Sequence, residues 1–248
     1  MARANELVAG KIYYADLNNE IKGLAKTPGE INVRDVNGQR YIGCGLKSHT
    51  KLNIFGTLGN DSACYMDGAT VEVFGNAQDG IANTMNDGKL LIHGNCGDIL
   101  GYAMRGGIVY VKGYVGCRSG IHMKEYMDKV PVIVIGSKAG DFLGEYMAGG
   151  RIVVLGLGLK KGEYSAGRFL GTGMHGGKMY IRGEIQTELM GREPVETAMD
   201  ETDKEFLQKT IDEYAGSFGA DLSEVKLEQF RKFQPKSSRP YGNMYIGN

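Results

Sequence analysis

The chain has 248 residues, with 29 basic and 29 acidic side chains and therefore a formal net charge of zero. Proteins that bind nucleic acid through its phosphates normally carry a basic excess, so we expect no nucleic-acid partner. No apolar run approaches the roughly 18 residues of a membrane span, and the first ten residues lack the apolar core of a secretory signal. Composition thus favours a cytoplasmic protein without membrane association.

Glycine is the unusual component, with 39 glycines against 5 prolines. The glycines follow no G-X-Y period, which excludes collagen. Valine and isoleucine lie between them, which excludes a disordered linker.

Short strand-like runs recur along the chain, and most of them end in glycine. The first copy, "EINVRD", is degenerate and ends at Asp35. Four copies then end 19 residues apart, at Gly56, Gly75, Gly94 and Gly113. Three more copies end at Gly136, Gly156 and Gly183, at spacings of 23, 20 and 27. The sequence therefore contains seven good repeats and one weak one.

A second pattern lies between these runs. One position is Leu or Met in every copy and is called here the methionine column: Leu46, Met66, Met85, Met104, Met123, Met147 and Met174. Three residues earlier a small residue recurs, the small column: Gly43, Ala63, Ala82, Gly101, Gly120, Gly144 and Gly171. Two-residue turns suited to positive φ precede five strands: Asp67-Gly68, Asp87-Gly88, Gly106-Gly107, Gly149-Gly150 and Gly176-Gly177.

Within each run alternate residues are apolar, as in Val71 and Val73, which predicts strands with one face inward. Their neighbours, such as Asn53, Glu72 and Tyr110, are freer in residue type. Nineteen residues are too few for a strand–helix unit, and helical solenoids need about 33. A sandwich would not keep a fixed spacing with matching corner glycines. We predict an all-β parallel β-helix of about 7–8 coils over residues 1–183, with the methionine column as a buried ladder.

The remainder, residues 184–248, holds only five of the glycines and is predicted to be an α-helical tail. One helix is expected from a capping box at Thr202 to Glu205 until Gly216. Its apolar stripe would contain Phe206, Leu207, Ile211 and Tyr214. Residues 222–233 are predicted to form a second short helix, and "SSRPYGNMYIGN" is predicted to be extended. The tail should pack over one end or flank of the column.

Two glycine-rich stretches resemble nucleotide-binding loops. "GTGMHG" (171–176) matches G-x-G-x-x-G, but a strand follows it where the dinucleotide fold requires a helix. "GCGLKS" (43–48) lacks the spacing of a phosphate loop. Both stretches coincide with repeat corners. The histidines share no repeat column, which favours scattered surface or hydrogen-bonded histidines over the alternative of a catalytic or metal-binding cluster: His49, His93, His122 and His175.

Cys44 and Cys64 both lie two residues before the methionine column, so adjacent coils would place them roughly 5 Å apart. They are either small buried thiols or a redox pair. Cys96 and Cys117 complete a scattered set without a C-x-x-C pair. Reduced thiols are expected, and a four-cysteine metal site is a weak alternative.

Charges and insertions mark candidate surfaces for a partner. Residues 120–131 and 156–167 break the repeat rhythm, and such insertions often form binding loops in solenoids. Charges near the corners are either solvated or part of a partner-binding edge: Arg105, Arg118, Lys124 and Glu145. No nucleophile–base pair, paired carboxylates or ligand-spaced cluster occurs. We therefore assign no catalytic, cofactor-binding or metal-binding residue and expect a rigid scaffold.

The repeat, G-x-x-M-x-G-G-x-[IVM]-x-[IV]-x-G, resembles the GXGXG domain. It is clearest in "GYAMRGGIVYVKG" and "GTGMHGGKMYIRG". In the large subunit of glutamate synthase this domain is a C-terminal right-handed β-helix. The runs "GIHMKEY", "GDFLGEYMAGG" and "SSRPYG" are similar to a stand-alone form of the domain in archaea and some anaerobic bacteria. The resemblance covers nearly the whole chain.

This resemblance implies a non-catalytic structural subunit of a multi-subunit glutamate synthase, which moves the amide nitrogen of glutamine to 2-oxoglutarate. It implies a glutaminase-type partner and a synthase-type partner that carries FMN and iron–sulfur clusters, with no cofactor on this chain. The chain begins Met1-Ala2, without the amino-terminal cysteine nucleophile of the glutaminase part, and it lacks the cysteine cluster of the flavin part.

Other oxidoreductase complexes contain a similar repeat. The repeat-bearing subunits of formylmethanofuran dehydrogenase and of N-methylglutamate synthase are alternatives within the same class. An independent hydrolase is an alternative of another class, but no serine lies in a G-x-S-x-G elbow.

Overall fold

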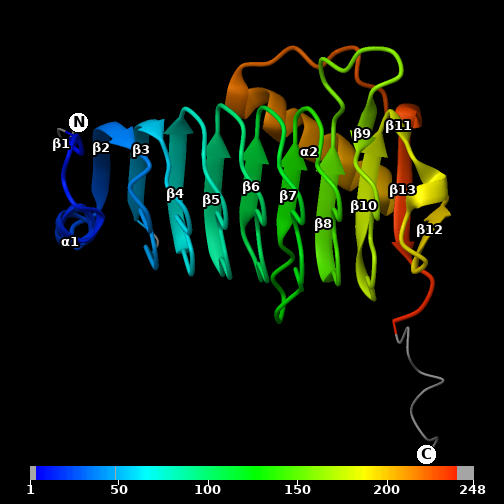
Figure 1. Ribbon diagram of the computed structural model, residues 1–248, viewed down its shortest axis with the longest axis horizontal. Helices are drawn as coiled ribbons and strands as arrows, with labels where there is room; N and C mark the ends of the chain where they lie inside the picture. The colour runs from blue at the N-terminus through cyan, green and yellow to red at the C-terminus, as the bar shows by residue number, and fades with distance from the viewer. Residues whose placement is uncertain (1–3, 48, 239–248) are drawn as a thin grey trace, which may run out of the picture.

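The computed structural model describes residues 4–47 and 49–238, which form a rod of stacked coils (Figure 1). The helices are α1 (Tyr14–Leu24) and α2 (Glu201–Phe218), and short 3₁₀ turns lie at Thr187–Leu189 and Leu227–Gln229. The strands are β1 (Asn5–Val8), β2 (Gly29–Asn37), β3 (Thr50–Thr57), β4 (Asp67–Phe74), β5 (Asp87–Ile92), β6 (Ile108–Val111), β7 (Val132–Ile135), β8 (Ala148–Val154), β9 (Tyr164–Ala166), β10 (Gly176–Arg182), β11 (Glu184–Ile185), β12 (Pro194–Thr197) and β13 (Phe230–Pro235). The end of the "SSRPYG" run lies outside the described residues.

Eleven strands form one sheet in the order β1-β2-β3-β4-β5-β6-β7-β8-β10-β13-β12. All neighbours from β1 to β10 are parallel, and β2 to β8 and β10 each begin one coil. The register keeps repeat positions opposite one another, as in Leu52 with Val71 and Val71 with Leu90. The predicted parallel β-solenoid of 7–8 coils is therefore confirmed.

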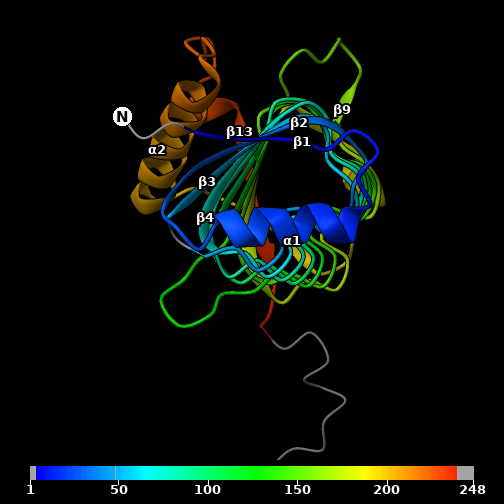
Figure 2. The ribbon, with the colours of Figure 1, turned by 90° about the vertical axis from the view of Figure 1, so that its left-hand side faces the viewer.

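A narrower ladder closes the opposite side of each coil. It consists of single parallel bridges that connect Leu58, Ala77, Cys96, Val115, Ala139 and Ala166. The small sheet of β9 and β11 continues it near the end of the rod. Seen along the rod, the successive coils superpose (Figure 2). Each coil therefore repeats the path of the one before it.

The interior of the rod is filled by apolar side chains from the inward face of the sheet and from the corners. Ile54, Val73 and Ile92 are fully buried there. The six methionines of the methionine column are also fully buried: Met66, Met85, Met104, Met123, Met147 and Met174. Side chains of one kind thus stack coil upon coil along the core.

The first helix, α1, has no counterpart among the sequence-based predictions. It lies across the opening of the first coil (Figures 1 and 2). Leu17 and Ile21 belong to the solenoid core and are 0% and 1% exposed. Asn18 ties the helix down by donating to the carbonyl oxygen of Arg40 at 2.8 Å. The helix therefore closes the end of the core.

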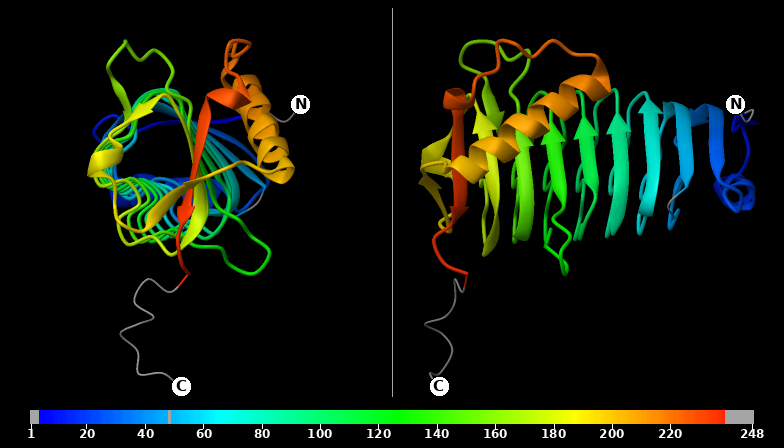
Figure 3. Two further views of the ribbon diagram at one scale, coloured as in Figure 1. Left: turned by 90° about the vertical axis from the view of Figure 1, so that its right-hand side faces the viewer. Right: turned by 180° about the vertical axis from the view of Figure 1, so that it is seen from behind.

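The second helix, α2, runs along the outer face of the sheet (Figure 3). The outward-facing Tyr110, Val134 and Tyr180 pack with Leu207 and other apolar residues of the helix in a second core cluster. Tyr110, which the alternating pattern leaves less constrained, is only 1% exposed because α2 covers it. Asn53 is also buried at 6% exposure, since it donates hydrogen bonds to the side chains of Glu30 and Asn32.

The predicted boundaries of α2 are corrected by the structure. The helix begins at Glu201 because Asp200 accepts a hydrogen bond from the Asp203 amide, and Asp203 accepts one from the Asp200 amide. This reciprocal pair replaces the expected box at Thr202 to Glu205. The helix continues through Gly216 and ends at Gly219, which is left-handed with φ 59°. The predicted apolar stripe is confirmed, with Leu207, Ile211 and Tyr214 buried.

The predicted second helix at 222–233 is wrong. This segment forms a turn, a 3₁₀ turn at Leu227–Gln229 and the strand β13. β13 pairs antiparallel with β10, and β12 pairs antiparallel with β13. Phe233 enters the solenoid core with no exposed surface. The open edge of the last coil therefore favours a strand over a helix.

Candidate functional site

The corners of the solenoid have a repeated backbone conformation. Residues five, three and one before the methionine column all have positive φ in every coil, from Tyr41, Gly43 and Gly45 in the first to Phe169, Gly171 and Gly173 in the last. The middle residue points inward: Ala63 and Ala82 are fully buried, and a Cβ on Gly101 would lie 2.6 Å from Ile133 Cδ1. The small column is therefore a packing requirement.

The two flanking left-handed positions point outward and carry large side chains. Tyr41, Tyr65, Ile99, Tyr146 and Phe169 are between 37% and 54% exposed. Because each coil repeats the same corner, these side chains form rows along the rod. The corners therefore present an apolar surface that residues 4–47 and 49–238 leave partly exposed.

Over the later coils, neighbouring side chains within two of these rows stack on one another. We call this surface the corner ridge, and its residues are Tyr102, Arg118, His122, Phe142, Tyr146 and Phe169. His122 stacks on Tyr146 with ring centroids 5.2 Å apart, and Phe142 stacks on Phe169 at 4.8 Å. Arg118 lies over Phe142 and forms a 3.2 Å ion pair with the buried Glu145. The stacked rings have fixed positions at the surface.

The first predicted insertion forms a small protruding hairpin, residues 124–131, called here the corner hairpin. It extends beyond the coils just before β7 (Figures 1 and 2). Tyr126 and Lys129 exchange backbone hydrogen bonds of 3.1 and 3.0 Å across its turn. Met127 at the tip has φ 56° and is 85% exposed, and Tyr126 is 50% exposed.

The corner hairpin is fixed to the rod at its base. Lys129 Nζ lies 2.8 Å from Asp87 and 3.7 Å from Asp67, so it bridges two corners. This contact lowers the pKa of Asp87 below its ordinary value. Glu125 accepts a hydrogen bond from the Gly150 amide at 3.1 Å. The hairpin thus holds two exposed apolar side chains on a preorganised base.

A buried ion cluster lies where α2 packs on the sheet. Asp203 is 1% exposed and accepts hydrogen bonds from Lys178 at 2.6 Å, Lys232 at 2.5 Å and the Tyr180 hydroxyl at 2.8 Å. Burial alone would raise the pKa of Asp203, but these donors hold it well below its usual range. All the groups of this cluster bind one another, so its role is to fix α2 on the sheet.

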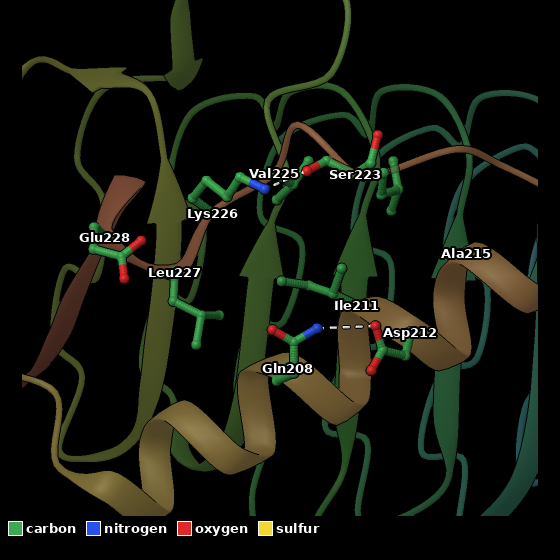
Figure 4. A pocket seen from close by; sticks show the side chains of 10 residues that line it. Gln208, Ile211, Asp212, Ala215, Ser223, Val225, Lys226, Leu227 and Glu228 are labelled. Atoms are coloured by element: carbon green, nitrogen blue, oxygen red, sulfur yellow. Dashed lines mark hydrogen bonds between the residues drawn. The ribbon is translucent and has the colours of Figure 1, made fainter.

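A pocket of about 420 Å³ lies between α2 and the segment that follows it (Figure 4). Its polar side chains are engaged locally: Gln208 donates to Asp212 at 2.9 Å, and Lys226 donates to the Ser223 carbonyl at 2.6 Å. Ile211 and Leu227 provide its apolar wall. The pocket has no set of polar groups that converge on one point, which a specific ligand site needs.

The cysteines predicted to stack do so. Sγ of Cys64 lies 3.0 Å from Sγ of Cys44 on the adjacent corner, whereas Cys96 and Cys117 are single thiols. The histidines are dispersed; His93 lies 2.9 Å from Glu72, and His122 belongs to the corner ridge. Within residues 4–47 and 49–238, no group of three or more His, Cys, Asp or Glu side chains could hold a metal ion. Over the same residues, no helix is long and apolar enough to cross a membrane.

The other predicted features occupy corners or loops. "GTGMHG" leads directly into β10, and Ser48 of "GCGLKS" lies outside the described residues. The residues missed by the sequence reasoning are the outward corner side chains and Met127. A signal for the first was present, because aromatic residues recur five and one positions before the methionine column. Met127 lies in the insertion 120–131, which the sequence indicated as a candidate surface, but nothing distinguished this residue within an insertion that occurs once.

Together these features define a parallel β-solenoid with glycine-rich corners, a capped end and an exposed corner surface. The chain belongs to the family described as the GXGXG motif, whose model matches residues 8–239. It is 46% identical over 246 residues to an uncharacterized protein of Methanocaldococcus jannaschii, in a match that covers 96% of this chain and 94% of the relative.

Proposed function

We propose that this chain is a non-catalytic structural subunit of a glutamate synthase-type complex. GXGXG domains occur in the large subunits of glutamate synthases, and the family match here extends over nearly the whole chain, residues 8–239. That extent is the observation that carries the proposal, because the β-helix domain of these enzymes has a structural role and the chemistry would lie on companions. A glutaminase-type subunit and an FMN- and iron–sulfur-containing synthase-type subunit would act on a rigid surface supplied by this rod.

The corner surface supports the proposal by its chemistry. Protein interfaces are enriched in aromatic residues, Met and Arg, and rigid anchors lose little entropy on binding. The corner ridge offers stacked rings and Arg118, and the corner hairpin offers Tyr126 and Met127. A companion with an apolar pocket would bury these side chains.

The test is to tag the full-length chain in cells that produce it and to purify what remains bound. We expect a complex with the absorbance of flavin and iron–sulfur clusters that makes two glutamates from glutamine and 2-oxoglutarate when a two-electron donor, reduced ferredoxin or NAD(P)H, is supplied. The separated chain should be inactive and colourless, and adding it back to the companions should restore the yield of complex. Glutamate formation or ester hydrolysis by the chain alone would contradict a scaffold, and a bound molybdenum or tungsten protein would indicate the formylmethanofuran dehydrogenase class.

A variant locates the contact. Changing Tyr126 and Met127 together to Ser should weaken companion binding about 10-fold or more, because both anchors are lost. Thermal stability should stay unchanged, since both side chains are exposed. Lys209→Ser, at a 77% exposed side chain on α2, is the matched control and should bind normally. Undiminished binding by the double variant would remove the corner hairpin from the interface.

A further inference from the structure

Cys44 and Cys64 form a pair of reactive side chains that the scaffold role does not use. The two side chains lie at the same repeat position of adjacent corners, with their sulfur atoms 3.0 Å apart. The Gly45 amide donates to the Cys64 carbonyl at 2.8 Å and fixes one corner on the other. Stacked coils are about 4.8 Å apart, within the Cα separation that a disulfide spans. The backbone therefore already has the geometry of a cross-link.

The two thiols differ in access and in proton affinity. Cys64 is 4% exposed, whereas Cys44 is half-buried and open to a reagent. The Cys64 thiol donates to the Cys44 sulfur, which lowers the pKa of Cys44 to about 6 and raises the pKa of Cys64. Lys22 of α1 also favours the Cys44 thiolate, while Asp61 on the neighbouring corner opposes it. Cys44 thus has the features of an attacking thiol and Cys64 those of a resolving thiol.

We propose that Cys44 and Cys64 are a redox-active dithiol that small-molecule disulfides oxidise to an intrachain disulfide. The Cys44 thiolate attacks one sulfur of the reagent RS–SR; a mixed disulfide forms, and one RS⁻ leaves and takes up a proton. Cys64 then loses its proton to water and attacks the Cys44 sulfur, and the second RS⁻ leaves. The protein loses two electrons and two protons, and RS–SR becomes two RSH.

The product joins the first two coils of the solenoid. The sulfur atoms need to approach by roughly 1 Å, which side-chain rotation supplies without a change of fold. The cross-link closes the segment between residues 44 and 64 beside α1, at the capped end of the rod. Oxidation of this pair is independent of the proposed scaffold role, because both thiols belong to this chain.

The test uses the purified full-length chain and oxidised glutathione, followed by intact mass and peptide mapping. We expect the mass to fall by two hydrogens, with residues 44 and 64 in one linked peptide and little glutathione retained. Cys64→Ser should stop at the glutathione adduct on Cys44, and Cys44→Ser should not react at this pair. Cys117 is the internal control: it is a partly exposed thiol outside the Cys44–Cys64 contact and should not appear in a linked peptide.

Two readouts do not depend on the variants folding. The rate of alkylation of Cys44 in the wild type should be half-maximal near pH 6, because its pKa is lowered to about 6, below the roughly 8.5 of an ordinary thiol. Oxidation should raise the melting temperature by roughly 6–12 °C, reversibly with a reducing agent. A stable glutathione adduct on wild-type Cys44, or four thiols still free after treatment, would overturn the proposal.

Discussion

At the scale of single residues, the corners depend on backbone conformations that most L-amino acids avoid. Each corner places three residues in the left-handed region, and Tyr65, Thr84 and His122 do so without being glycine. Such residues cost about 1–2 kcal/mol each and persist only where the surrounding structure determines them. Here the stacked corner above and below supplies that constraint through backbone hydrogen bonds, such as the one from the Tyr65 amide to Asn83.

The glycine that ends each strand is needed for a different reason, the close approach of the neighbouring coil. A Cβ on Gly75 would collide with the carbonyl oxygen of Gly56 in the coil below, so Gly75→Ala should force the two coils apart. We expect a loss of about 2–4 kcal/mol in the free energy of unfolding, measured by urea denaturation. Gly23→Ala is the control: its Cβ would meet nothing within 4 Å inside α1, so we expect a gain of about 0.5 kcal/mol. Equal stabilities would contradict the packing argument.

What the sequence revealed at this scale depended on repetition. The methionine column and the small column were visible because one residue type recurs at one position. The left-handed conformation of Thr84 and His122 could not be read from the sequence, because neither residue type by itself indicates a positive φ. The close approach of Cys44 and Cys64 was predictable, since stacking alone determines it.

At the scale of elements, α2 is held by an ion cluster at one end and apolar packing along its length. Asp203 binds Lys178 and Lys232, and Tyr214 donates to the Val111 carbonyl at 3.2 Å. Tyr110 could not be assigned to this contact from its own strand, because the helix that covers it follows about a hundred residues later. The strand β13 could not be predicted from its own sequence for the same reason, because its conformation depends on pairing with the open edge of β10.

Asp203→Asn should destabilise the protein by about 3–5 kcal/mol, because two lysines lose their buried counter-ion. The pKa of Asp203 in the folded chain lies below its ordinary 3.8. Its carboxylate therefore stabilises the fold above about pH 4, and this contribution fades as pH falls further. The free energy of unfolding, measured in urea, should fall less between about pH 7 and pH 2 for Asp203→Asn than for the wild type.

Glu196→Gln provides the comparison, since its pair with Arg231 is about half exposed and should contribute less than 1 kcal/mol. If Asp203→Asn and Glu196→Gln lost the same stability, or if both kept the wild-type acid dependence, the cluster would not hold α2.

We expect the cap α1 to stabilise the first coils of the rod more than the last ones. Leu17→Ala should cost about 2–5 kcal/mol, since the side chain is fully buried at the open end of the core. Because a solenoid unit contacts only its neighbours, hydrogen exchange should rise in β2 and β3 and stay unchanged in β8 and β10. Asn19→Ala, on the exposed face of the same helix, should change neither quantity. A uniform rise of exchange along the rod would show that the coils unfold as one unit.

At the scale of the whole molecule, the repeat makes length adjustable in units of one coil. Duplicating Thr57–Gly75, a complete 19-residue repeat, should give a folded protein with one more turn. This segment lies beyond the end of α2, whose Phe218 packs edge-on against His93 in a later coil. Circular dichroism and cooperative melting should resemble those of the wild type. Inserting half of the repeat should add no turn, because a partial coil can only loop out, as the insertions at residues 120–131 and 156–167 break the 19-residue rhythm without disturbing the register of the later strands.

The overall architecture was predictable because each coil obeys the same local rules, and the ends were not because they occur once. The helix α1 and the reversed strand β13 take their conformations from the unfilled surfaces they cover. Neither shares the repeat pattern, so periodicity in the sequence carried no information about them.

The reversed direction of β13 and β12 has a consequence for assembly. A column of parallel strands could in principle accept further identical units at its edge, as fibrils do. In this protein a short antiparallel pair occupies that edge at one end, and a helix covers the core at the other. Eleven strands with ten spacings of about 4.8 Å give a sheet roughly 48 Å wide. Proteins attached near opposite ends would therefore be held at a constant separation, encoded in the number of repeats.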